Sequence, residues 1–222
     1  MAEPENRSNE LPGAFSLFRP SLNAIMVNLV TLIELVAVPL LVVGLGGVLK
    51  NHGGSVITPF GEILALVLAP AAYLTQLMSV QNKKIDFTKA IKESMHYFWR
   101  LIGLAICVGV VVGIGFILLI VPGLIMLRRY ILSPYYLLDR DMKIFDAMRA
   151  SAAESKQFSG AIWGLIGVEI LISLASAVIS ILLGPLSAVG FLVYYTYYCA
   201  PAIRYLEIKR ASKPSSAAAP IV

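Results

Sequence analysis

Charged residues are scarce in this chain. Only 14% of its 222 residues are Asp, Glu, Lys or Arg, whereas 58% are hydrophobic, and the mean hydropathy is +0.81. A soluble domain of this length does not carry so large an apolar fraction. The composition therefore excludes an ordinary soluble globular protein and indicates a membrane protein.

Histidine and cysteine are also rare, and their scarcity removes the usual routes to catalysis. His52 and His96 have no neighbouring His or carboxylate at the spacing of a metal site, and Cys107 and Cys199 each stand alone in an apolar run. No glycine-rich phosphate loop leads into a cytosolic helix. We therefore expect no enzyme activity, no metal and no cofactor.

Long apolar runs are what the chain has in abundance. A bilayer span needs roughly 20 mostly apolar residues. Six runs are predicted to be spans, at residues 22–49, 61–80, 101–121, 124–138, 160–183 and 186–203. The run 124–138 is the shortest and contains two arginines, so an interfacial segment is the alternative for it. The expected fold class is all-α, a polytopic membrane protein of about six transmembrane helices arranged as three helical hairpins.

Short amphipathic segments precede the second and third predicted hairpins. Residues 86–100 and 141–158 place apolar side chains at helical spacing and polar ones on the other face, so both are expected to lie along the membrane interface. Segments 85–94 and 142–151 match in pattern, which predicts an internal repeat.

The domain limits follow from the same patterns. Residues 14–210 are expected to form a single membrane domain. Residues 1–13 read as a polar tail without a signal peptide. Residues 211–222, rich in Ala, Ser and Pro, are expected to be disordered.

Basic residues gather in the connections between the predicted hairpins. The most prominent are Lys83, Lys84, Lys89, Lys92 and Arg149. Because Lys and Arg in short loops stay on the cytoplasmic side, we expect these connections and both termini in the cytoplasm and the chain in a bacterial inner membrane. The net charge of +5 then describes a surface that attracts anionic lipid headgroups, not nucleic acid. This orientation requires the run 124–138 to cross the bilayer.

A few ionisable side chains fall inside the predicted spans, where they are costly and by default mark a paired or functional position. Counted along the helices at 1.5 Å per residue, they share a depth near the middle of the bilayer. Two serines follow the second glutamate on the same helix face. We call these residues the polar cluster: Glu34, Arg128, Arg129, Glu169, Ser173 and Ser176.

Two hypotheses explain the polar cluster. In the first, Glu34, Glu169 and one arginine form a buried ion pair or triad that fixes helix register, with the serines bonding across helices. In the second, the same groups line a polar cavity for an anionic solute or lipid headgroup, with the arginine as the anion's partner.

Tyrosines gather near the ends of two predicted spans. An aromatic belt at the membrane interface is the interpretation we favour over a ligand cage. The tyrosines concerned are Tyr135, Tyr136, Tyr194, Tyr195, Tyr197, Tyr198 and Tyr205.

A series of short motifs between about Gly115 and Gly164 resembles a known pattern. It consists of Pro122-Gly123, an arginine at 128 or 129, an acid at 139 or 141, and Ala147-Met148-Arg149-Ala150-Ser151. This series is similar to the recurring signature of a bacterial integral-membrane family that includes the membrane domain attached to some glycerophosphoryl diester phosphodiesterases. The resemblance implies a six-helix fold in the cell envelope and no activity of the membrane domain itself. In the fused proteins the chemistry belongs to a separate soluble barrel, which this sequence does not contain.

The sequence thus leads to two expected functions. The first is a non-catalytic inner-membrane protein with an envelope or lipid-related scaffolding role, which contacts anionic lipids and docks an unidentified partner on its basic cytoplasmic side. The alternative is a small transporter or channel for an anionic solute or lipid headgroup that uses the polar cluster.

Overall fold

Every regular element in the described part of the chain is a helix. The computed structural model describes residues 11–48, 57–183 and 194–212. Within these ranges the all-α prediction is confirmed. The elements are the 3₁₀ helix η2 (Ala14–Leu17) and the α-helices α1 (Phe18–Val27), α2 (Leu29–Val48), α3 (Ile57–Val80), α4 (Phe87–Met95), α5 (Phe98–Leu118), α6 (Ile120–Tyr130), α7 (Ser133–Arg140), α8 (Ile144–Gln157), α9 (Ser159–Leu183) and α11 (Ala200–Ala211).

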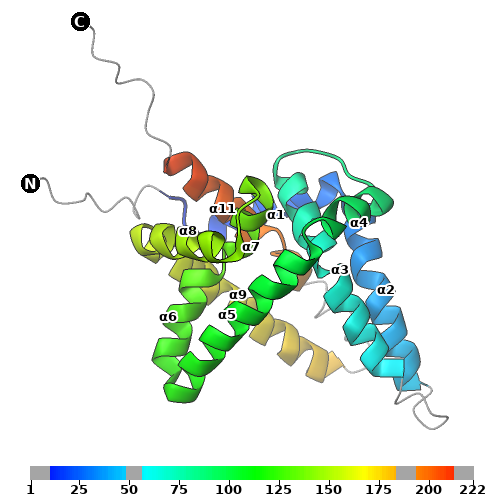
Figure 1. The fold of residues 1–222 in the computed structure, drawn as a ribbon. Helices are drawn as coiled ribbons and strands as arrows, with labels where there is room; N and C mark the ends of the chain where they lie inside the picture. The colour runs from blue at the N-terminus through cyan, green and yellow to red at the C-terminus, as the bar shows by residue number, and fades with distance from the viewer. Residues whose placement is uncertain (1–10, 49–56, 184–193, 213–222) are drawn as a thin grey trace, which may run out of the picture.

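Long apolar helices extend from a layer of short ones. Helices α1, α4, α7, α8 and α11 lie toward one end of the molecule, from which the hairpins α2–α3 and α5–α6 and the long helix α9 project (Figure 1). We call this layer the short-helix end. The α5–α6 connection lies at the opposite end, as do the last described residues of α2 and the first of α3 (Figure 1).

Three helical segments are long and apolar enough to cross a membrane: Pro59–Val80, Phe98–Leu118 and Ser159–Ile179. The bent pair Ala14–Val27 and Leu29–Pro39 adds a fourth if it counts as one span. The described ranges thus contain three or four candidate spans, where the sequence predicts six. Residues 186–193 of the sixth predicted span lie outside these ranges.

Most of the outward side chains of these helices are apolar. At the α5–α6 connection, residues 117–121 are all large hydrophobics, and Ile117 is 86% exposed. So much contiguous exposed apolar surface marks a face that contacts lipid or another protein rather than water. The helices are therefore consistent with a membrane protein.

The first predicted span, 22–49, does not form one straight helix. The chain bends by 87° between α1 and the first part of α2. Asn28, at the bend, leaves the helical region with φ −127° and ψ 39°. Its side chain bonds to Ser79 in the last turn of α3 and to the backbone of the segment between α3 and α4, so a tertiary contact determines the break.

The fourth predicted span, 124–138, is also two elements. Helix α6 ends at Tyr130, and α7 begins at Ser133 with Pro134 in its first turn, where the missing N–H of proline is tolerated. The eleven residues of α6 extend about 16 Å, about half of a hydrocarbon core. Helix α7 continues in a new direction as a buried core helix.

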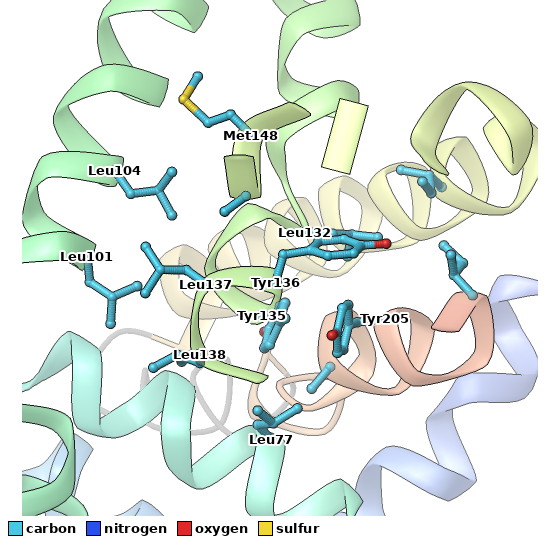
Figure 2. Packing of buried hydrophobic residues seen from close by; sticks show 14 of the residues in the cluster. Leu77, Leu101, Leu104, Leu132, Tyr135, Tyr136, Leu137, Leu138, Met148 and Tyr205 are labelled. Carbon is cyan, nitrogen blue, oxygen red and sulfur yellow. The ribbon is translucent and has the colours of Figure 1, made fainter. Parts of the chain in front are cut away.

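Helix α7 is the centre of the main hydrophobic core (Figure 2). Its side chains contact helices that are far apart in sequence, α3, α5, α8 and α11. The principal members of this core are Leu77, Leu101, Leu104, Leu132, Tyr135, Tyr136, Leu137, Leu138, Met148 and Tyr205. These contacts hold α3, α5, α7, α8 and α11 together at the short-helix end.

Helices α4 and α8 occupy the two segments expected to be interfacial, with shorter bounds. The expected segment 86–100 divides into α4 and the first residues of α5, and the segment 141–158 contains α8. Each helix follows an extended residue, and each buries one alanine and one serine a turn later, Ala90 and Ser94 in α4 and Ala147 and Ser151 in α8. Their opposite faces are exposed.

The last predicted span, 186–203, ends inside α11, a helix that carries charged residues. Helix α11 runs past residue 203 to Ala211 and buries Arg204 completely, at 0% exposure. The Arg204 guanidinium donates to the carboxylate of Glu207 at 2.8 Å and to the backbone carbonyl of Pro12 at 3.0 Å. This helix therefore packs within the protein and fastens the N-terminal segment to the short-helix end.

Candidate functional site

The polar cluster does not assemble into an ion pair or triad. Glu34 is exposed on α2. Within residues 11–48, 57–183 and 194–212, no salt bridge includes Glu34, Arg128, Arg129 or Glu169. The register-fixing triad expected from the sequence is therefore not formed by these side chains.

Arg128 and Arg129 instead hold α6 against α8 and α9. The Arg128 guanidinium donates to Ser159 Oγ at 2.5 Å and lies over the ring of Trp163, 5.8 Å from its centroid. The backbone carbonyl of Arg129 accepts a hydrogen bond from Ser151 at 2.7 Å. Both arginines occupy the last turn of α6, where cations are stabilised by the helix dipole. The depth expected for them assumed that one helix continues through residue 138, whereas α6 ends at Tyr130 and a separate helix begins at Ser133.

Glu169 lines a cavity, but Glu34, Arg128 and Arg129 are not among the residues that line it. The cavity has a volume of about 500 Å³ and is lined by residues of α2, α3, α7 and α9, by Ile131 and by residues 194–201. Its size is in the range of small-molecule sites. Besides Glu169 and apolar side chains, its walls carry one amide and six tyrosines: Gln76, Tyr73, Tyr135, Tyr194, Tyr195, Tyr197 and Tyr198. We call it the tyrosine cavity.

A second hollow, of about 470 Å³, lies between α6 and α9. Glu169 and Ile131 line both hollows, and Ser173 lines the second. Ser176, the other serine of the predicted stripe, is not among the residues that line either one. We call the second hollow the lateral groove.

The aromatic-belt interpretation is wrong for four of the seven tyrosines. Tyr135, Tyr136, Tyr197 and Tyr205 are each at most 2% exposed. Tyr135 donates its hydroxyl to Oε1 of Gln76 at 2.5 Å. These residues are parts of the protein interior, where aromatic side chains contribute large buried areas.

One residue of the sequence, Gln76, indicates that some of these tyrosines lie in the interior. Gln76 interrupts an apolar run one turn after Tyr73, and an amide within a span needs a partner. In the structure the ring of Tyr73 meets the ring of Tyr135 edge-on, with centroids 5.8 Å apart. Helices α3 and α7 thereby supply neighbouring parts of the cavity wall.

Asp139 joins α7 to α11 and α3 at the short-helix end. Its carboxylate accepts hydrogen bonds from Tyr205 at 2.6 Å, from Lys209 and from Gln81. Burial disfavours the charged form of Asp139, but the bonds from Lys209 and Tyr205 outweigh it and hold the pKa below its ordinary value. Burial and the bond to Asp139 raise the pKa of Tyr205.

Glu154 makes a second polar junction nearby. It accepts hydrogen bonds from the hydroxyl of Tyr136 and, at 3.2 Å, from Ser212, and it lies 3.6 Å from the guanidinium of Arg140. These contacts tie α8 to α7 and α11. Among the described residues no group of three His, Cys, Asp or Glu is placed to hold a metal ion, and both junctions act as structural links.

The basic residues predicted for the cytoplasmic side are all exposed. They belong to α4, to the connection before it and to α8, which lie at the short-helix end (Figure 1). The ion pairs within the set, Lys89 with Glu93 at 3.8 Å and Arg149 with Asp146 at 4.0 Å, are long and solvent-exposed, so they neutralise little. The basic surface consists of Lys83, Lys84, Lys89, Lys92 and Arg149.

Comparison with protein families places the chain in a family of unknown function. The model of an uncharacterised protein family, UPF0259, covers residues 55–194, more than half of the chain. The chain belongs to this family. The UPF0259 match includes Glu169, both arginines of the polar cluster and the whole basic surface. No curated protein and no solved structure matches the chain significantly.

Proposed function

We propose that this UPF0259 protein is a non-catalytic, multi-pass protein of the bacterial inner membrane with a lipid-related scaffolding role in the cell envelope. In this proposal the basic surface faces the cytoplasm and retains anionic lipids of the inner leaflet. The observation that carries the proposal is the position of the basic surface at the short-helix end, opposite the exposed apolar connection of α5 and α6.

The charge distribution along the α5–α6 hairpin supports this orientation. Residues 101–127 contain no charged side chain, and the tip at 117–121 is exposed and apolar. Such a tip is stable in hydrocarbon and costly in water. With the tip in the bilayer, the lysines before and on α4 extend to the headgroup level, where each basic residue gains about 1 kcal/mol from an anionic surface.

The resemblance to the membrane domain of glycerophosphoryl diester phosphodiesterases belongs to the same proposal. It supports a lipid-related role, since the fused enzymes act on glycerophosphoryl diesters. The anion-transport alternative has less support, because the tyrosine cavity is lined by the carboxylate of Glu169, whereas Arg128 bonds to Ser159 away from it.

The proposal is tested by the lipids that the protein retains. The full chain is reconstituted in nanodiscs with equal amounts of phosphatidylglycerol and phosphatidylcholine, extracted gently, and examined by native mass spectrometry. We expect retained phosphatidylglycerol to exceed phosphatidylcholine, and the excess to shrink in high salt as exposed charges are screened.

Matched variants of four residues make the test specific. Replacing Lys83, Lys84, Lys89 and Lys92 together by glutamine should abolish the excess, because the charges are lost at little cost in shape. Replacing the same four by arginine should preserve it. Equal retention of phosphatidylglycerol by the glutamine and arginine variants would contradict the proposal.

A further inference from the structure

The tyrosine cavity contains an acid without a counter-charge. No hydrogen bond or salt bridge joins the carboxylate of Glu169 to another residue of the described chain, and no Lys or Arg is among the residues that line the cavity. Glu169 belongs to the candidate span Ser159–Ile179. An unpaired carboxylate within a membrane span is costly, and such a residue marks a site that meets a partner from outside the chain.

The cavity walls have the chemistry that attracts cations. The faces of tyrosine rings carry negative electrostatic potential and bind ammonium groups, and sites for quaternary ammonium ligands are built from several such rings. Here the rings come from α3, α7 and residues 194–198, and they contact one another, as Tyr195 and Tyr198 do with centroids 4.9 Å apart. Glu169 adds a carboxyl group to this aromatic wall, and a bound cation stabilises the ionised form of such a group.

The carboxylate of Glu169 also borders the lateral groove, whose walls are mainly apolar. The groove shares Glu169 and Ile131 with the tyrosine cavity, and its apolar walls come from α6 and α9. Ile170 and Leu174 on these walls are 53% and 61% exposed, so the groove opens on the outward face of α9. A ligand with a cationic centre and an apolar part therefore matches the two hollows together.

We propose that the tyrosine cavity is a binding site for a lipophilic organic cation, with its ammonium or phosphonium centre beside Glu169 and its apolar part in the lateral groove. The natural ligand is a lipid with an amine headgroup or a free amphiphilic cation, since both present this chemistry. This site is separate from the basic surface, and its charge is opposite, so it does not depend on the proposed retention of anionic lipids.

The test measures binding of tetraphenylphosphonium to the full chain. The protein is reconstituted in nanodiscs of phosphatidylcholine, and tritiated tetraphenylphosphonium is titrated in a scintillation proximity assay. We expect saturable binding, with an affinity that falls about tenfold or more in Glu169→Gln because the charge of the counter-ion is lost. Partition into lipid is the same for all variants, so their differences report the protein site.

Glu34 provides the matched control. It is a second carboxylate within the long apolar helices, but it is exposed on α2 and is not among the residues that line either hollow. Glu34→Gln should bind as the wild type does. Tyr73→Phe should also bind, because the ring face remains, whereas Tyr73→Leu should weaken binding roughly 3- to 30-fold, the range of a cation–π contact.

The outcomes decide the proposal even if a variant is unstable. Glu169→Asp keeps the charge and should keep saturable binding, and thermal unfolding of each variant in the nanodisc identifies any that fails to fold. Equal binding by the wild type and a folded Glu169→Gln would overturn the proposal, as would equal losses in Glu169→Gln and Glu34→Gln. If phosphatidylethanolamine added to the nanodisc competes with tetraphenylphosphonium, the ligand is an aminolipid, and if it does not, the ligand is a free cation.

Discussion

Removing the side chain of Asn28 should destabilise the protein more than its position in an apolar run suggests. The Asn28 amide donates to Ser79 Oγ at 2.9 Å and to the carbonyl of Lys83 at 2.8 Å, and it accepts from the N–H of Ile85 at 2.8 Å. Asn28 is only 5% exposed. These three bonds connect the α1–α2 break to the segment that leads from α3 into α4.

The magnitude follows from these contacts. Each hydrogen bond contributes a net free energy of about 1 kcal/mol, and each buried backbone group left without a partner costs about 1–3 kcal/mol. Asn28→Ala removes all three bonds, so we expect the free energy of unfolding to fall by about 2–4 kcal/mol, toward the upper value because the buried N–H of Ile85 loses its partner. Thr31→Val, which removes one bond to the Ile85 carbonyl, should cost about 1 kcal/mol.

Reversible unfolding by sodium dodecyl sulfate in mixed micelles, followed by circular dichroism, measures this change. Asn23→Ala is the matched control, because Asn23 has the same side chain and is exposed on α1. It should change the free energy of unfolding by less than about 0.5 kcal/mol. If Asn28→Ala and Asn23→Ala unfold at the same detergent concentration, the tertiary origin of the break at Asn28 is refuted.

Two further predictions concern the α5–α6 hairpin and the Asp139 junction. A Cβ on Gly115 would lie 2.9 Å from Cα of Gly123 on the facing backbone, so Gly115→Ala should lower the free energy of unfolding in the same assay by about 1–3 kcal/mol. Gly109→Ala is the control, because nothing lies within 4 Å of a Cβ there, and it should leave the free energy of unfolding unchanged. Equal losses in the two variants would contradict the close approach of α5 and α6. The lowered pKa of Asp139 stabilises the fold fully above about pH 4, and this contribution is lost as the pH falls toward that pKa. Asp139→Asn should therefore reduce the acid-dependent loss of thermal stability, and an unchanged pH profile would show that the bonds from Tyr205 and Lys209 do not stabilise the carboxylate.

The sequence predicted those elements whose signal is local. The apolar lengths of α3, α5 and α9 alone identify helices suited to a bilayer. The amphipathic spacing of 86–100 and 141–158 identifies the segments that contain α4 and α8, with wider bounds than the helices have. The class of the fold depends on these features, and the prediction of an all-α chain is therefore correct for the described residues.

Long-range contacts determine the features that the sequence did not predict. The run 124–138 reads as a membrane segment, but its second half forms α7, whose hydrophobic side chains contact α3, α5, α8 and α11 instead of lipid. Hydropathy alone does not distinguish these environments. The break at Asn28 depends on partners more than 50 residues away. The tyrosine cavity likewise needs α3, α7 and residues 194–198 together, so the sequence showed Glu169 without its surroundings.

The orientation of the basic surface is the central claim, and labelling of single cysteines tests it most directly. Cys107 and Cys199 are first replaced by serine, and cysteine is then introduced at Lys84 or at Lys143, both exposed at the short-helix end. A membrane-impermeant maleimide should label neither position in intact bacterial cells and both in inverted inner-membrane vesicles. Labelling of either position in intact cells would place the basic surface outside the cytoplasm and contradict the proposed function.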